Sequence, residues 1–154
     1  MVVKTRAFGE IDVDEEKIIT FPNGIVGFPE LQKFTLLYDL EKGQSVGVKW
    51  LQSLDEPEFA LPVMDPLLVK PDYNPSVEDE LLKPIGELKD EYLLVQVAMN
   101  VPSDLTRMTV NLQAPLIINA ETKKGCQVIL ESGEYPIRFA IYDILKDNKK
   151  KTEE

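Results

Sequence analysis

The chain has 154 residues, with 27 acidic side chains against 17 basic ones, no histidine and a formal net charge of −10. This length is enough to bury a core as one domain without metal or disulfide crosslinks. The lack of histidine removes the commonest general base, the imidazole metal ligand and every Ser-His-Asp or Cys-His arrangement. The acidic charge repels phosphate backbones, so it argues against nucleic acid and favours a basic protein partner.

Other sequence features exclude further classes. Cys126 is the only cysteine, which rules out an intramolecular disulfide and a multi-cysteine metal site. The sequence has neither a Walker loop nor a G-x-G-x-x-G motif, and we expect no cofactor and no metal. The N-terminus lacks the apolar core of a signal peptide, and apolar runs are too short for a membrane helix. We therefore expect a cytoplasmic protein that does not enter the membrane.

Apolar residues recur at every second position through most of the chain, which is the pattern of half-buried strands. The alternation is clearest from Glu91 to Met99, where Leu93, Val95 and Val97 share one face. In chain order, the other strands are predicted at residues 2–8, 17–21, 34–40, 46–54, 59–64, 110–118, 127–130 and 137–144. The last segment also has apolar residues four apart, as on a helix, but its β-branched content favours a strand.

The regions between the predicted strands are rich in turn formers. Eleven prolines and several Gly or Asn residues mark turns and leave little room for long helices. Short helices are predicted at Pro29–Lys33 and Val77–Leu82, because proline suits a first helical turn and Pro84 ends the second segment. The fold class is therefore all-β: a small antiparallel β-barrel-like single domain, with one or two short helices.

The domain is predicted to span residues 1–145. Residues 146–154 contain no apolar side chain, so we expect a disordered lysine-rich tail. Between Asp55 and Glu91, eleven acidic side chains face three basic ones, a net charge of −8. A second acidic run lies between Glu10 and Glu16. Such runs are either solvated loops that keep the protein soluble or docking surfaces for a basic partner.

The abundance of carboxylates leaves an enzymatic alternative open. A hydrolase that acts through two carboxylates needs them to face each other across a cleft, one with a raised pKa. Pairs such as Glu56 and Glu58 would share a face of a strand, but acids two apart are common in solvated loops. A carbohydrate-binding β domain without catalytic activity is a further alternative. A calcium loop starting at Asp12 fails, because Lys17 occupies the position that requires glycine.

A set of motifs, collinear from about Phe8 to Phe139, resembles one known family. It comprises Ile19-Thr-Phe-Pro-Asn-Gly-Ile-Val-Gly-Phe28, Trp50-Leu-Gln-Ser53 followed by Asp55 and Pro57, Val63-Met-Asp-Pro66 with Tyr73, Thr109-Val-Asn-Leu-Gln-Ala-Pro115, and Gln127-Val-Ile-Leu130. Each motif is weak alone, but their order and intervals are specific. In these residues the chain resembles the FliW flagellar assembly factor family.

The resemblance implies a β-barrel-like protein without catalytic activity. It implies two partners: CsrA, a small basic RNA-binding repressor of translation, and flagellin. Free flagellin would occupy the protein while secretion lags. Once flagellin is exported, the released protein would bind CsrA and relieve repression of flagellin translation. We expect a monomer when neither partner is bound.

Two sets of residues are candidates for these contacts. The local charge of −8 favours an acidic CsrA-binding surface formed by Asp55, Glu56, Glu58, Asp65, Glu78, Asp79 and Glu80. Helical flagellin ends would bind through apolar faces. The apolar residues after the turn at Pro22 are therefore the candidate flagellin patch: Ile25, Val26 and Phe28.

Overall fold

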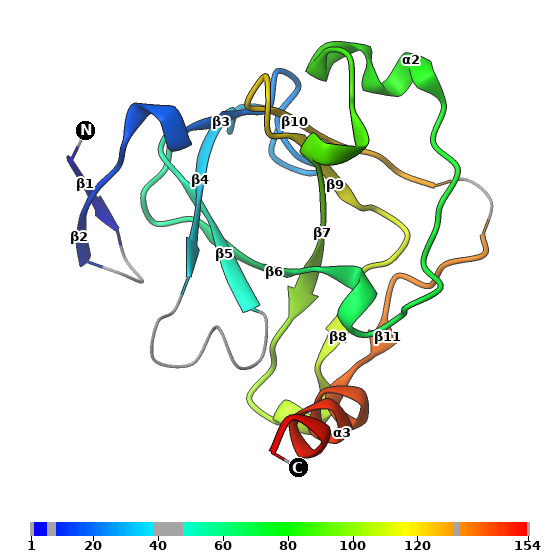
Figure 1. The fold of residues 1–154 in the computed structure, drawn as a ribbon. Coiled ribbons are helices and arrows are strands. Elements are labelled where there is room, and N and C mark those ends of the chain that lie inside the picture. Colours follow the sequence, from blue (N-terminus) through cyan, green and yellow to red (C-terminus); the bar gives the residue numbers. More distant parts are fainter. Residues whose placement is uncertain (1, 6–8, 39–47, 131–132, 154) are drawn as a thin grey trace.

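The computed structural model describes residues 2–5, 9–38, 48–130 and 133–153. Strands dominate it, and Figure 1 shows them curving into a barrel. The strands are β1 (Val2–Thr5), β2 (Gly9–Asp12), β3 (Ile19–Thr20), β4 (Lys33–Tyr38), β5 (Val48–Ser53), β6 (Ala60–Met64), β7 (Leu93–Asn100), β8 (Thr109–Val110), β9 (Leu116–Asn119), β10 (Lys124–Gln127) and β11 (Phe139–Ala140).

Short helical segments connect the strands. They are the 3₁₀ turns η1 (Glu15–Lys17), η2 (Pro66–Leu68), η3 (Lys83–Ile85), η4 (Asp90–Tyr92) and η5 (Leu105–Arg107), and the α-helices α2 (Asp79–Leu82) and α3 (Tyr142–Glu153). The α2 helix lies within the helix predicted at Val77–Leu82. No helix of the described residues is long and apolar enough to cross a membrane.

The barrel closes because β7 pairs on both sides. Its strands follow the order β7-β6-β5-β4-β3-β10-β9, and β9 pairs back onto β7. The pairings are antiparallel apart from one parallel pair, Lys124 opposite Thr20, which joins β10 to β3. β8 and β11 extend the sheet beyond β7, and β1 and β2 form a separate hairpin. The predicted all-β, barrel-like fold is confirmed.

The barrel interior is filled by aliphatic and aromatic side chains. Phe21 and Phe34 are both 0% exposed, and their ring centroids lie 5.3 Å apart in an edge-to-face arrangement. Leu51, Leu116 and Ile118 belong to the same core cluster. Burying one side chain of this size contributes roughly 1.5–3 kcal/mol, so this cluster is a major source of stability.

The strand β7 is covered on both faces, which explains its long apolar run. Val97 and Met99 pack outside the barrel against the extension strands and the start of α3, in a cluster that contains Val110 and Ile141. Gln96 alternates with these residues and is 0% exposed. The predicted shared face of Val95 and Val97 is therefore the outer face of the barrel wall.

Two predicted elements differ from the structure in the first and middle parts of the chain. The helix predicted at Pro29–Lys33 is wrong, because residues 29–30 form a turn and β4 begins at Lys33. The strand predicted at residues 110–118 is broken, because the Asn111 carboxamide oxygen accepts the N–H groups of Gln113 (3.0 Å) and Ala114 (3.2 Å). Such a side-chain turn competes with the strand ladder.

The C-terminal predictions also need correction. β10 occupies residues 124–127, ahead of the predicted strand at 127–130. Residues 137–144 contain only the two-residue β11, and α3 begins at Tyr142. The helical spacing of Ile141 and Leu145 prevails because of the cluster outside the barrel, which we call the outer cluster. Ile141 belongs to it and Leu145 packs against it. α3 continues to Glu153, through the segment for which the composition predicts a disordered tail. The boundary of the domain at residue 145 stays a prediction.

The seam between β3 and β10 is close-packed at one glycine. A Cβ atom on Gly125 would lie 2.7–3.0 Å from three ring atoms of Phe21, closer than side chains approach each other. The Phe21 ring is fully buried and has no room to retreat. The packing of Phe21 therefore requires glycine at position 125.

We expect Gly125→Ala to destabilise the protein by about 1–3 kcal/mol, because the added methyl group overpacks the core. Urea unfolding monitored by circular dichroism measures the change. Phe21→Leu provides the matched background, since the smaller side chain makes room for the methyl group. If Gly125→Ala costs as much in that background as in the wild type, the contact with Phe21 is not the cause.

Candidate partner-binding surfaces

The turn between β5 and β6, residues 54–59, is an acidic turn held by a buried glutamine. Its exposed acidic residues are three of the predicted CsrA contacts: Asp55, Glu56 and Glu58. The Gln52 side chain, 0% exposed, donates from Nε2 to three carbonyl oxygens at 2.9–3.1 Å: those of Ser53, Pro57 and Phe59. The backbone of the acidic turn is therefore fixed before any partner binds.

Asp55 also ties the acidic turn to β4. Its Oδ2 accepts the backbone N–H groups of Gln32 (2.7 Å) and Lys33 (2.9 Å). These charge-assisted bonds satisfy donors at the end of the preceding loop and start β4 there. They also explain why this segment does not continue as the predicted helix. The Asp55 carboxylate thus has a structural role in addition to its proposed contact with a partner.

The other predicted acidic residues lie on two further elements. Asp65 is half-buried at the end of β6, where its Oδ1 accepts the Leu67 N–H at 2.9 Å and caps η2. Three exposed residues stand at the start of α2, where acidic side chains suit the helix dipole: Glu78, Asp79 and Glu80. The structure thus distributes the seven residues over the acidic turn, η2 and α2.

The predicted apolar patch lies on the apolar loop, residues 21–32, between β3 and β4. Val26 is 52% exposed and Phe28 is 40% exposed, but Ile25 is 5% exposed and belongs to the barrel core. The loop turns back on itself through the bridge between Ile25 and Phe28. Gly24 has φ 68°, and a Cβ there would lie 2.5 Å from the Phe28 carbonyl oxygen. Of the three residues of the predicted patch, only Val26 and Phe28 are therefore open to a partner.

Contacts between residues far apart in the sequence bring the apolar loop beside the acidic turn and beside α2. The Phe28 ring packs on Phe59 of the acidic turn, with centroids 4.8 Å apart. The Val26 N–H donates to Gln127 Oε1 at 2.7 Å. In this position Val26 lines a hollow of about 540 Å³, together with Leu81 of α2 and the exposed Ile129. Ile129 and Leu81 were not predicted, because no local pattern places them beside the apolar loop.

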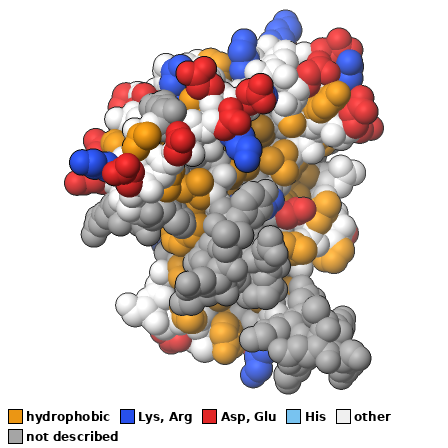
Figure 2. All heavy atoms as spheres, turned by 60° about the vertical axis from the view of Figure 1, so that its left-hand side comes forward, with side chains coloured by type: hydrophobic (Ala, Val, Ile, Leu, Met, Phe, Trp, Pro, Cys, Tyr) orange, Lys and Arg blue, Asp and Glu red, His pale blue; other side chains and the backbone are white. Residues whose placement is uncertain are grey.

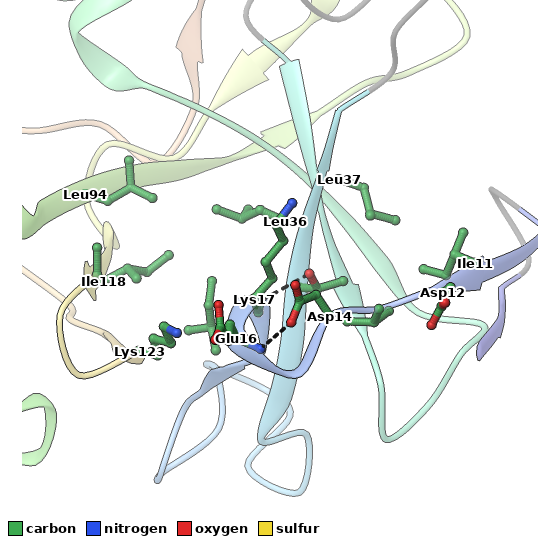
Figure 3. Close-up of a pocket in the computed structure, with 14 residues that line it drawn as sticks. Ile11, Asp12, Asp14, Glu16, Lys17, Leu36, Leu37, Leu94, Ile118 and Lys123 are labelled. Carbon is green, nitrogen blue, oxygen red and sulfur yellow. Dashed lines mark hydrogen bonds between the residues drawn. The ribbon is translucent and has the colours of Figure 1, made fainter. Parts of the chain in front are cut away.

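Three acids of the second acidic run line another hollow, of about 640 Å³, beside η1. Figure 3 shows the Lys17 side chain extending beside Leu36, with Leu94 and Ile118 on the far side. Asp14 caps η1 by accepting the Glu16 N–H at 3.0 Å. Its lining is mostly aliphatic, and its three carboxylates, those of Asp12, Asp14 and Glu16, are exposed to water. Exposure leaves none of them with the burial that raises the pKa of a catalytic acid.

The molecular surface also combines acidic and hydrophobic side chains. In Figure 2, Asp and Glu side chains gather over the upper part of the face that contains the β1–β2 hairpin, with hydrophobic side chains exposed among and below them. The β1–β2 hairpin, η1 and the residues between them carry exposed acids: Glu10, Asp12, Asp14, Glu15 and Glu16. This composition suits protein contacts in which apolar anchors lie within a charged rim.

The described part of the chain offers few groups for catalysis. Every Asp and Glu whose side chain is described is exposed except Asp65, which is half-buried. No group of three His, Cys, Asp or Glu side chains in the described residues is placed to hold a metal ion. Cys126 is a half-buried free thiol, and desolvation by burial raises its pKa, which reduces its fraction of reactive thiolate.

Comparison with known proteins identifies the family. The family model described as FliW protein matches residues 2–141. The chain belongs to the FliW family. It is 52% identical over 147 residues to a protein of Lachnospira eligens named flagellar assembly factor FliW, covering 95% of this chain and 97% of that one.

Other FliW proteins match over similar lengths. The one from Lachnoclostridium phytofermentans is 47% identical over 151 residues, covering 98% of this chain and 97% of its own. The one from Thermotoga maritima is 40% identical over 150 residues, covering 97% and 98%. A crystal structure of the flagellar assembly factor FliW superposes with a TM-score of 0.84 at 29% identity, covering 92% of this chain and 97% of that one. The FliW fold is therefore the fold of this chain.

We expect Asp55→Ala to lower the free energy of unfolding by about 1 kcal/mol, because two backbone N–H groups lose their acceptor. Urea unfolding measures the loss. Glu56→Ala is the matched control, since its side chain is exposed on the same turn, and we expect a change within about 0.5 kcal/mol. Equal effects of the two substitutions would contradict the structural role of Asp55.

Proposed function

We propose that this protein is a non-enzymatic, cytoplasmic flagellar assembly factor that binds and antagonises CsrA and also binds flagellin. In this way it couples flagellin translation to flagellin secretion. The observation that carries the proposal is the match of the FliW family model over residues 2–141, together with relatives named flagellar assembly factors over nearly their whole lengths. We propose that the free protein is a monomer and contacts neither nucleic acid nor the membrane.

The charge distribution supports the CsrA half of the proposal. The protein carries a formal net charge of −10, and the proposed partner is basic. Exposed acids on the acidic turn and on α2 would attract it over a distance comparable to the Debye length, about 8 Å in physiological salt. Such attraction raises the association rate and makes binding sensitive to salt.

The apolar loop supports the flagellin half. Val26 and Phe28 are exposed on a loop whose backbone is fixed by Gln127 and by the ring contact with Phe59. A fixed apolar surface loses little conformational entropy on binding, which favours affinity. An amphipathic helical end of flagellin would place its apolar face on these side chains.

The exposure of the carboxylates weighs against the enzymatic alternative. A hydrolase with two carboxylates keeps one of them protonated by burial, as an acid near neutral pH. Among the described Asp and Glu side chains, the most enclosed is the half-buried Asp65, which already caps η2. No observation in the structure favours the hydrolase or the carbohydrate-binding alternative.

Gel filtration with light scattering tests the proposed function. The purified protein is run alone and with CsrA of the same organism, at low and at high salt. We expect a complex at low salt that weakens at high salt. A complex of equal stability at low and high salt would indicate that apolar rather than acidic surface makes the contact. The lack of any complex in either buffer would contradict the CsrA half of the proposal.

We expect the triple variant Glu78→Lys, Asp79→Lys and Glu80→Lys to associate with CsrA about ten-fold more slowly at low salt, because α2 then repels the basic partner. Surface plasmon resonance measures the rate. The matched control is Glu10→Lys, Asp12→Lys and Glu15→Lys, which changes the total charge equally on the β1–β2 hairpin and η1. Equal slowing in both variants would mean that α2 is not the contact.

We expect Phe28→Ala to weaken flagellin binding roughly ten-fold, because it removes the largest exposed side chain of the apolar loop. Titration calorimetry with flagellin measures the affinity, and circular dichroism verifies the fold. Ile137→Ala is the control, since Ile137 is 57% exposed and lies outside the apolar loop. A folded Phe28→Ala variant with normal affinity would remove this loop from the flagellin contact.

A further inference from the structure

A second apolar hollow, of about 440 Å³, lies on the other side of α2. We call it the leucine socket. Its walls come from η2, the segment before α2, α2 itself, β7 and β9, and include Leu67, Val77, Leu82, Leu93, Val95 and Ile117. Leu67 is 51% exposed and Leu93 is 43% exposed at its rim, whereas Ile117 in its wall is 5% exposed. Two rim leucines are therefore left in water beside a buried apolar wall.

The socket is lined mostly by carbon atoms, and its polar side chains are those of Asp65, Asn74 and Tyr73. Tyr73 lines it, but its hydroxyl already donates to the Leu112 carbonyl oxygen at 2.7 Å. The Tyr73 ring is held in place by Tyr135, with centroids 4.7 Å apart in an edge-to-face arrangement. The wall is thus rigid, and a ligand gains by filling the socket with apolar side chains.

The surroundings of the socket are acidic. Asp65 lines it and uses Oδ1 to cap η2, and Glu78 follows the lining residue Val77. Two lysines of the same stretch are already paired: Lys70 with Asp72 at 3.2 Å, and Lys89 with Glu121 at 3.6 Å. Lys83 follows the lining residue Leu82, but from Asp65 to Glu91 the chain carries eight acidic side chains and three basic ones. An occupant that brings positive charge is therefore favoured.

We propose that the leucine socket is the anchor point for a basic segment of the protein partner. It takes one or two aliphatic side chains of that segment, while a neighbouring Lys or Arg pairs with Asp65 or Glu78. This inference rests on the proposed function, because the basic partner is the one named there. A second copy of this chain does not fit, since two surfaces of the same negative charge repel each other.

The acids of α2 and the leucine socket are expected to affect different rate constants of binding. Exposed acids on α2 govern how fast a basic partner arrives, whereas a desolvated apolar anchor governs how long it stays. A few well-packed anchors commonly dominate an interface that is otherwise close to neutral. Removal of the rim leucines should therefore act on dissociation, and the charge reversal on α2 on association.

The test uses the full-length double variant Leu67→Ala with Leu93→Ala, and CsrA as the partner, in surface plasmon resonance at low salt. We expect the dissociation rate to rise at least ten-fold, with the association rate unchanged within two-fold. The matched control is Val101→Ala with Leu105→Ala, two residues of similar exposure at 45% and 52% that do not line the socket. The control should behave as the wild type.

A second variant guards against an unfolded protein. Leu67→Lys changes one half-exposed side chain and places a cation at the socket, so it should also weaken binding while the circular dichroism spectrum is kept. If both variants are folded and dissociate as the wild type does, the socket is not the anchor, and a response to charge reversal on α2 would leave the proposed function intact. If the wild type does not bind CsrA at all, both proposals are overturned.

Discussion

The closure of the barrel depends on a short seam between β3 and β10. One parallel pair, Lys124 opposite Thr20, joins them, and the Thr20 N–H donates to the Lys123 carbonyl oxygen at 2.9 Å. Lys123 takes a left-handed conformation, φ 59°, to present that oxygen. With so few hydrogen bonds, the seam relies on the packing of Phe21 over Gly125. Only when these strands meet does the wall enclose the apolar core.

The surfaces available to partners follow from this closed wall. Its strands are short, so the connections between them are close together and carry the side chains that the core does not use. The acidic turn, the apolar loop and α2 are such connections. The acidic turn and the apolar loop are held by specific side-chain bonds rather than by secondary structure: Gln52 holds the acidic turn, and Gln127 holds the apolar loop. A small barrel thereby presents several rigid surfaces on one chain.

The sequence predicted what local pattern controls. Alternation located β5, β6 and β7, because these strands keep one face in the barrel, and the resemblance on ordered motifs identified the family. Local pattern failed where distant groups decide. Asp55 starts β4 from 22 residues away and prevents the helix at Pro29–Lys33, and the outer cluster selects helix after Ile141. The exposure of Ile25 and the shared hollow of Val26 and Leu81 depend on tertiary contacts that no spacing encodes.

The bond between Val26 and Gln127 spans 101 residues of chain, and it has a consequence for the order of events during synthesis. The barrel cannot close, and the apolar loop cannot take its final shape, until β10 has left the ribosome. Strands made early must wait for a partner made late, which slows folding and delays the native loop. The nascent chain therefore cannot present this loop in its native shape before Gln127 has been translated. Only chains that extend past Gln127 compete for a partner through this loop.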